Sequence, residues 1–128
     1  MAGMTPTLTA GEFAFCATRD RELIARASPG ALGWFREEEG TTLILPLGEA
    51  RTLGFTEAMS MRRIVLEVFS ALDGVGLTEG VVTALARANI PCNIVAAYHH
   101  DHVFVPAALA ERACAVLIGV AARAKAER

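Results

Sequence analysis

The feature that most constrains the fold is the order of apolar runs and breaks between Ile64 and Val105. The successive segments are IVLEVFS, ALDGVG, LTEGVVTALARANI, CNIVAAY, HHDH and VFVP. The first, fourth and last are short and rich in β-branched or aromatic residues, which is typical of strands. Leu77, Val81 and Leu85 form the apolar stripe of a helix, and Asn89 is expected to help end it. The stretch therefore predicts strand, glycine loop, helix, strand, tight turn and strand.

A last helix is predicted after Pro106, a residue well suited to a first helical turn. The resulting order over residues 62–125 is β-α-β-β-α, a ferredoxin-like unit that lacks one strand. The segments EFAFCATR and TTLIL, both within residues 12–47, are the candidates for the missing strand. We therefore expect an α+β fold, with an antiparallel sheet and helices on one face.

The first half of the chain has weaker patterns. Residues 1–10 are interpreted as a loose lead-in, and EFAFCATR as a first strand because its aromatic residues recur at every second position. DRELIARA predicts a short helix, and a hairpin follows with arms at 34–37 and 41–45. Two halves, 12–61 and 62–125, are thus predicted to form one cooperative unit.

Composition excludes several classes of protein. The 128 residues are 53% hydrophobic and 20% charged, with a net charge of −2, which suits a packed domain without a basic surface for nucleic acid. The apolar runs are too short to span a bilayer, and no secretory signal is visible at the start. The three cysteines form no CxxC pair, so we expect free thiols in the cytoplasm and no cofactor held by them.

Two turns carry the candidate site residues. Gly74 and Gly76 would expose main-chain amides near a helix start, where a carboxylate is favoured, and Asp73 or Asp101 could pair with an amino group. The alternative is that the glycines only shape a strand-to-helix turn. The HHDH segment resembles a set of metal ligands, but it offers two ligands per face where a metal site wants three or four. A plain hairpin turn is the favoured explanation. We expect no bound metal and no catalytic residue.

Other conspicuous side chains have ordinary explanations. Trp34 and Phe35 are expected in a core or an interface, and Arg62 and Arg63 at a solvated strand entry. Tyr98 is expected to pack at the end of the sheet with its hydroxyl in water. Glu67, on a strand, could face solvent, an interface or a cationic ligand, with solvent favoured.

Taken together, the DGVG loop, the ANIPCNIVAAY strand entry, the DHVFVP exit and the earlier WFREEEGTTLILP resemble the ACT domain family. The likeness spans roughly residues 12–120. More narrowly, the chain resembles tandem-ACT proteins related to the CASTOR arginine sensors and their small bacterial relatives. ACT domains commonly bind amino acids or other small metabolites at an interface between two such units. The likeness implies these ligand-binding residues: Ser70, Asp73, Gly74, Val75, Gly76, Leu77, Asn93, Ile94 and Asp101.

The resemblance also implies how the chain would act. In a departure from the common regulatory arrangement of the family, we expect no attached catalytic domain, so a sensed signal would pass to another, unidentified protein. The expected function is non-catalytic, regulatory binding of an amino acid or related metabolite by a homodimer. Two alternatives remain open: a structural or protein-interaction module without a ligand, and a metal-dependent enzyme that uses the His-Asp turn.

Overall fold

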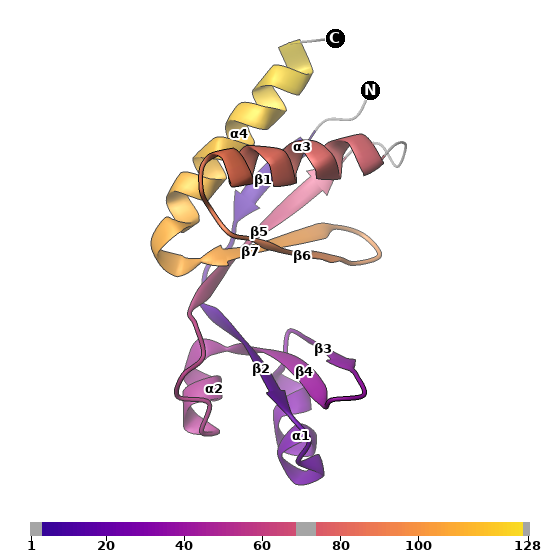
Figure 1. The fold of residues 1–128 in the computed structure, drawn as a ribbon, viewed down its shortest axis with the longest axis vertical. Coiled ribbons are helices and arrows are strands. Elements are labelled where there is room, and N and C mark those ends of the chain that lie inside the picture. Colours follow the sequence, from indigo (N-terminus) through magenta and orange to yellow (C-terminus); the bar gives the residue numbers. More distant parts are fainter. Residues whose placement is uncertain (1–3, 69–73, 127–128) are drawn as a thin grey trace. The chain divides into compact units, whose positions relative to one another are not determined.

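A computed structural model of the chain describes residues 4–68 and 74–126. The contacts divide the chain into two compact units. The smaller unit is continuous and comprises residues 11–61, whereas the larger unit combines residues 1–10 with residues 62–128. In Figure 1 the colours follow the sequence, and the indigo strand labelled β1 is the N-terminal strand that belongs to the larger unit.

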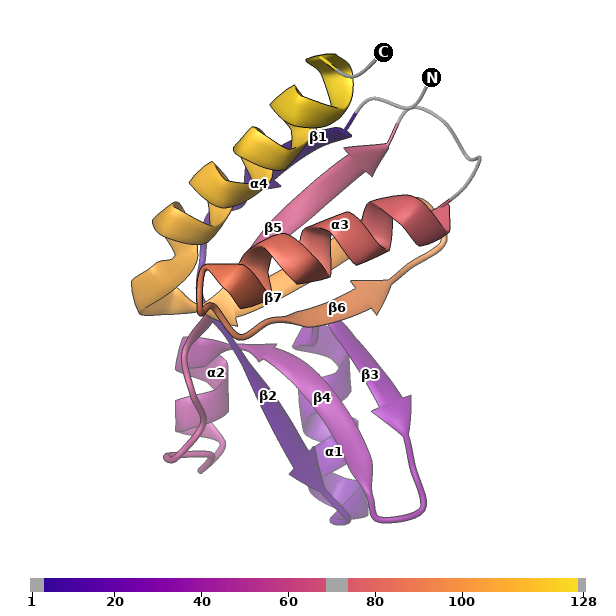
Figure 2. The ribbon, with the colours of Figure 1, turned by 45° about the horizontal axis from the view of Figure 1, so that its top comes forward.

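The larger unit is a four-stranded sheet with the strand order β1-β5-β7-β6. β1 runs antiparallel to β5, and β6 runs antiparallel to β7. Figure 2 shows the two long helices, α3 and α4, on one face of this sheet. This is the predicted ferredoxin-like α+β arrangement. Its elements are β1 (Met4–Leu8), β5 (Met61–Val68), α3 (Gly74–Arg87), β6 (Asn93–Ala96), β7 (Asp101–Pro106), the 3-10 turn η2 (Ala107–Leu109) and α4 (Ala110–Ala126).

The strand that completes this sheet is β1, so the prediction of a loose lead-in at residues 1–10 was wrong, as was the choice of a strand from residues 12–47. Met4 pairs with Val68, and Leu8 pairs with Ile64. Beyond β1, Thr9 donates its N–H to the carbonyl of Arg63 over 3.0 Å. The sequence MTPTL is a weak strand signal because it is short, contains a proline and has exposed threonines at its second and fourth positions. Its Met4 and Leu8 nevertheless pack against the core.

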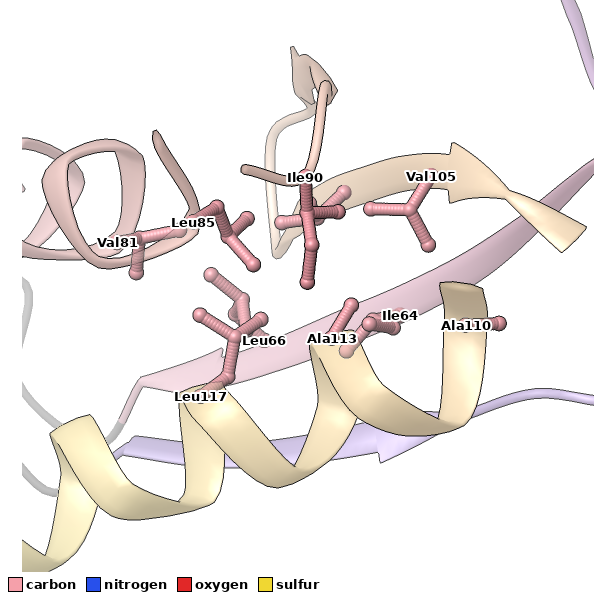
Figure 3. Packing of buried hydrophobic residues seen from close by; sticks show 10 residues of the cluster. Ile64, Leu66, Val81, Leu85, Ile90, Val105, Ala110, Ala113 and Leu117 are labelled. Carbon is pink, nitrogen blue, oxygen red and sulfur yellow. The ribbon is translucent and has the colours of Figure 1, made fainter. Parts of the chain in front are cut away.

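The core of the larger unit lies between the sheet and its two helices. Figure 3 shows side chains of β5 meeting those of α3 and α4. Ala110 and Ala113 are fully buried on α4, and their small size lets that helix lie close to the sheet. The buried cluster consists of Ile64, Leu66, Val81, Leu85, Ile90, Val103, Val105, Ala110, Ala113 and Leu117.

The end of α3 explains how the chain turns back toward β6. Asn89 has a φ of 63°, a left-handed conformation that asparagine tolerates better than most residues. Its N–H donates to the carbonyl of Ala86 over 3.0 Å, and the N–H of Ile90 donates to the carbonyl of Leu85 over 2.9 Å. This pair of bonds is a Schellman motif, with Ile90 and Leu85 both buried in the core. The predicted role of Asn89 in ending the helix is confirmed.

The smaller unit has a three-stranded order, β3-β4-β2, and Phe13 of β2 also pairs with Met61, the unit's last residue. Asp20 caps α1 by accepting the N–H groups of Glu22 and Leu23. The predicted first strand, short helix and hairpin are confirmed. The elements are β2 (Phe13–Thr18), α1 (Arg21–Ala27), the 3-10 turn η1 (Ser28–Gly30), β3 (Gly33–Arg36), β4 (Thr41–Pro46) and α2 (Leu47–Thr52). Its buried cluster consists of Ala14, Cys16, Ala27, Leu43, Leu45, Leu47 and Ala50.

Both helices of the smaller unit contribute to that cluster through Ala27 of α1 and Leu47 and Ala50 of α2. The two short helices therefore cover the same face of the three-stranded sheet. Among the described residues, no helix in either unit is long and apolar enough to cross a membrane.

Candidate functional site

The predicted glycine loop spans the junction between β5 and α3. Ser70 and Asp73 lie outside the described residues. Gly74, Val75 and Gly76 lie in the first turn of α3, so their assignment to a loop was wrong. Leu77 also lies in this helix, as its place in the apolar stripe predicted. Glycine disfavours a helix by only about 1 kcal/mol, and the apolar stripe that follows outweighs this cost.

The first turn of an α-helix has a general preference for anions. The first N–H groups of an α-helix have no acceptor within the helix, and together they favour an anion. Gly74 and Gly76 carry no side chain that would shield these amides. The main chain of the first turn of α3 is therefore chemically suited to a carboxylate.

Asn93 and Ile94 are adjacent on β6, so their side chains point to opposite faces of the sheet. Ile94 is half-buried and packs against the core of the larger unit. Asn93 is exposed on the other face. The structure thus separates two residues that the resemblance groups together, and Ile94 already has a role in packing.

Asp101 begins β7 and pairs with Ala96, so its assignment to the turn was wrong, as was that of His102. The turn instead closes where Ala97 donates its N–H to the carbonyl of His100 over 3.0 Å. Because Ile94 pairs with Val103, two residues on from Asp101, Asp101 and Ile94 share the face that carries the helices. Of the predicted side chains that are described, these two lie on a common face.

The opposite face holds a polar group that the sequence did not predict. Arg63 Nη1 lies 3.4 Å from His102 Nδ1, and Arg63 Nε lies 3.4 Å from Thr9 Oγ1. A guanidinium can only donate, so Nδ1 must accept, which requires a neutral imidazole with its proton on Nε2. Arg62 also donates to the carbonyl of Thr9 over 3.1 Å. The two arginines therefore do more than form the solvated strand entry that was predicted.

The electrostatics of this group favour the same neutral state. Burial lowers the pKa of His102, and the positive charges of Arg63 and His100 lower it further, while Asp101 opposes them. A sequence signal did exist for this pair. Arg63 precedes the apolar Ile64 and His102 precedes Val103, so both fall on the outer face once β5 and β7 are neighbours.

The histidine-rich hairpin was the candidate for a metal site. Among the residues that the structure describes, no three His, Cys, Asp or Glu side chains are grouped to hold a metal ion. Tyr98 is 96% exposed, so its predicted packing at the sheet end was wrong. Its ring contacts His99 edge-on, at a centroid distance of 4.9 Å.

Two of the three cysteines have raised thiol pKa values. All three are free, with Cys16 buried and Cys92 and Cys114 half-buried. Burial raises the pKa of both the Cys16 and the Cys92 thiol, so these two stay protonated near neutral pH. Protonated thiols are poor nucleophiles, and this chemistry does not favour a cysteine-dependent reaction.

The sequence also led to predictions about the exposure of three further side chains. Glu67 is exposed, in agreement with the favoured prediction of a solvent-facing carboxylate. Trp34 is 57% exposed and Phe35 is 72% exposed, so neither belongs to the core.

Two family models match the chain in tandem. Residues 1–62 match one ACT domain model, and residues 60–118 match a second. This chain is an ACT-domain protein. The matches do not test the narrower likeness to the arginine sensors, and no curated protein matches the chain significantly.

Solved structures agree with this assignment. A protein of unknown function from Vibrio cholerae, described as a possible transport protein, is 35% identical, with a TM-score of 0.82, over 93% of this chain and 91% of that one. A protein from Agrobacterium tumefaciens is 15% identical, with a TM-score of 0.69, over 93% and 90% of the two chains. The regulatory subunit of aspartate kinase from Thermus flavus is 10% identical, with a TM-score of 0.58, over 92% and 96%. The last two show a shared fold alone.

Membership of the ACT family sets the general role. ACT domains are generally regulatory modules that bind ligands such as amino acids, and the assignment points to a regulatory, non-catalytic protein.

Proposed function

We propose that this chain binds an amino acid or a closely related metabolite at an interface between ACT units, and that it does so as a homodimer without catalysing a reaction. The observation that carries the proposal is the pair of ACT matches, which together span residues 1–118. The bound state would be communicated to a separate protein. The three free thiols are consistent with a reducing, cytoplasmic setting.

The start of α3 supports a ligand with a carboxylate. Its first turn contains Gly74 and Gly76, and the amides of such a turn favour negative charge. Asp101, half-buried at the start of β7, is the proposed partner for an α-amino group. Ser70 and Asp73 complete the proposed set, together with Val75, Leu77, Asn93 and Ile94.

A thermal-shift screen of the twenty amino acids on the full chain tests the proposal. A ligand present at a hundred times its dissociation constant stabilises the folded state by about 2.7 kcal/mol, which is a readily measured shift in melting temperature. We expect one amino acid, or a small related group, to give such a shift. A protein that remains folded and dimeric but responds to none of them would contradict amino-acid binding.

Two glycine variants locate the response within α3. Gly76→Ala places a methyl group in the first turn and should reduce the ligand-induced shift. Gly80→Ala is the matched control, because the nearest described atom to a Cβ there is a Val120 methyl carbon at 4.0 Å, an ordinary contact. If both variants keep the full shift, the amides of the first turn are not the binding group.

The same measurements separate the alternative of a structural module. A module without a ligand would show no shift with any amino acid, and its assembly would be unchanged in Gly76→Ala and Asp101→Ala. Retained assembly together with a lost ligand response in either variant would instead favour the proposed function.

A further inference from the structure

A group of basic side chains lies on the face of the larger unit's sheet opposite α3 and α4. Arg63 of β5 and His102 of β7 meet there, with Arg63 Nη1 and His102 Nδ1 3.4 Å apart. Thr9, just beyond β1, holds the guanidinium from the other side, because its Oγ1 accepts from Arg63 Nε over 3.4 Å. All three residues are half-buried, so the sheet orients them while part of each remains exposed to solvent.

The contact between Arg63 and His102 is a weak one. Hydrogen bonds from N–H groups usually have donor–acceptor distances of about 2.9–3.0 Å, so 3.4 Å is long. A guanidinium is always charged, and its strongest partners are carboxylates and phosphates, whose negative charge shortens and strengthens the bond. A neutral imidazole nitrogen brings no such charge. An anion that replaced it as the acceptor from Nη1 would therefore gain more than the present contact loses.

Positive charge is concentrated around this contact. Arg62 adds a second guanidinium, whose Nη2 donates to the carbonyl of Thr9 over 3.1 Å. The ring of His100 lies beyond, with its centroid 6.5 Å from that of His102. Asp101 is next to His102 in β7, so the alternation of the strand sends its carboxylate toward the face that carries the helices. The local field therefore favours an anion beside Arg63 and His102.

From this geometry we infer that Arg63 and His102 form a binding site for a phosphate group, with Thr9 as the residue that positions the guanidinium. The site goes beyond the proposed function, since it lies on the opposite face from Asp101. Binding draws a proton from solvent onto His102 Nδ1, which then donates to the anion, while Nε2 keeps its own proton. Nitrogen atoms 3.4 Å apart can both donate to one anion.

The charge of the protonated site selects a phosphate group over a carboxylate. Once His102 is protonated, two positive charges face each other through nitrogen atoms 3.4 Å apart. A carboxylate carries one negative charge and leaves the pair with a net positive charge, whereas a phosphate group carries about two near neutral pH. Its tetrahedrally placed oxygens can also meet donors from two strands. A planar carboxylate instead matches the fork of a single guanidinium.

Anion binding at this site is linked to pH through His102. The charged and titratable groups around the imidazole are Arg63 on β5, His100 in the turn and the adjacent Asp101, while the residue opposite on β6 is the uncharged Val95. Without an anion, burial and the two cationic neighbours lower the pKa of His102. A bound negative charge acts in the opposite direction and raises this pKa. The anion must therefore bind more tightly as the pH falls and His102 becomes protonated.

Proton NMR of the histidine ring signals in the full chain tests the site, with sulfate as the probe. Sulfate is a tetrahedral dianion that does not titrate near neutral pH, so any pH dependence comes from the protein. Compared with chloride at matched ionic strength, sulfate should raise the pKa of His102 and bind about tenfold more tightly at about pH 5.5 than at about pH 7.5. Identical titrations of His102 in the two salts would overturn the inference. Sulfate bound only at the start of α3 would leave His102 unchanged and would have the same meaning.

An asparagine variant tests the role of the imidazole by isothermal titration calorimetry with sulfate. His102→Asn keeps an oxygen that can accept from Arg63 but cannot gain a charge, so it should weaken binding about tenfold at about pH 5.5 and abolish the pH dependence. His99→Asn, an exposed change in the same hairpin, is the matched control and should bind as wild type does. Wild-type affinity and pH dependence in His102→Asn would refute the site. The NMR titration of the wild-type chain decides the matter even if this variant fails to fold.

Inorganic phosphate, glycerol phosphate and acetate identify the ligand class in the same calorimeter. Binding of inorganic phosphate alone points to the free ion, and binding of the ester as well points to the phosphoryl group of a larger metabolite. Acetate that binds as tightly as either would contradict the preference for a doubly charged group. The amino-acid response is measured separately by thermal shift. A chain that binds sulfate at His102 but no amino acid refutes only the proposed function, and the reverse result refutes only this site.

Discussion

The two compact units follow one plan but reach it by different routes. The smaller unit is a continuous stretch whose α1 and α2 have seven and six residues. The larger unit has helices of 14 and 17 residues, and its sheet is completed by β1 from the far end of the chain. The long helices make the larger unit easy to recognise in the sequence, whereas the strand that completes its sheet is barely marked there.

The largest effect is expected from removal of β1, which tests whether the larger unit needs this remote strand. Deletion of residues 1–9 would leave β5 without its β1 partner and would remove Met4 and Leu8 from contact with the core. We expect the larger unit to lose its cooperative unfolding transition, as followed by circular dichroism during urea denaturation. Deletion of residues 1–3 alone is the control and should preserve the transition.

The single tryptophan, Trp34, reports on the smaller unit during the same titration. If the shorter chain keeps a wild-type transition by circular dichroism, β1 contributes little and the dependence on the remote strand is wrong. A change in the tryptophan transition as well would show that the two units unfold together.

Within the smaller unit, the largest local effect is expected at Gly40, in the hairpin between β3 and β4. Its φ is +148°, and a Cβ there would lie 2.9 Å from the backbone oxygen of Thr18. Gly40→Ala should therefore destabilise the protein by about 1–3 kcal/mol, measured by urea denaturation with Trp34 fluorescence. A cost below about 0.5 kcal/mol would mean that the hairpin adapts to a side chain.

Gly48→Ala provides the control for this substitution. Gly48 lies in α2, and no atom of the described part of the chain lies within 4 Å of a Cβ placed there. Alanine favours a helix more than glycine does, so this change should be neutral or slightly stabilising.

The smallest expected effect is a pH dependence of stability that arises from His102 in the larger unit. Its folded pKa is lowered from 6.5, mainly by burial and also by Arg63 and His100. The unfolded chain therefore takes up a proton at a higher pH than the folded chain does. The stability contributed by neutral His102 is present above pH 6.5 and is lost as the pH falls from 6.5 through the lowered folded value.

His102→Asn should flatten this pH dependence, because an asparagine oxygen can still accept from Arg63 but does not titrate. The measurement is the free energy of unfolding between pH 7.5 and about pH 5, a range that brackets the ordinary histidine pKa. His99→Asn, an exposed substitution in the turn, is the matched control. Equal slopes for wild type and His102→Asn would contradict a role for the neutral imidazole.

The sequence predicted most of the fold because periodicity and turn chemistry are local signals. The stripe of Leu77, Val81 and Leu85 identified α3, and Asn89 marked its end correctly. β1 was missed because its pairing with β5 is a long-range property that a short proline-containing strand does not display. The start of α3 was misplaced because the glycines suggested a loop, although a strong apolar stripe can extend a helix over them.

The candidate site was less predictable than the fold. Asn93 and Ile94 were grouped by likeness, yet the alternation of β6 sends their side chains to opposite faces. The contact between Arg63 and His102 requires the strand order as well as each strand's alternation, and the order is set by packing over the whole unit. Asp101 was singled out as a residue to test, and its place on β7 differs from the predicted turn.

The placement of β1 has a consequence for synthesis of the protein. Thr9 and Arg63, which bond at the end of the β1–β5 pair, are 54 residues apart in the chain. As the chain leaves the ribosome, the whole smaller unit emerges and can fold before β1 meets its partner. Until β5, α3 and α4 have been synthesised, β1 has no partner strand and its backbone groups remain solvated. The larger unit is begun first and finished last, and non-local pairing of this kind is intrinsically slower than local pairing.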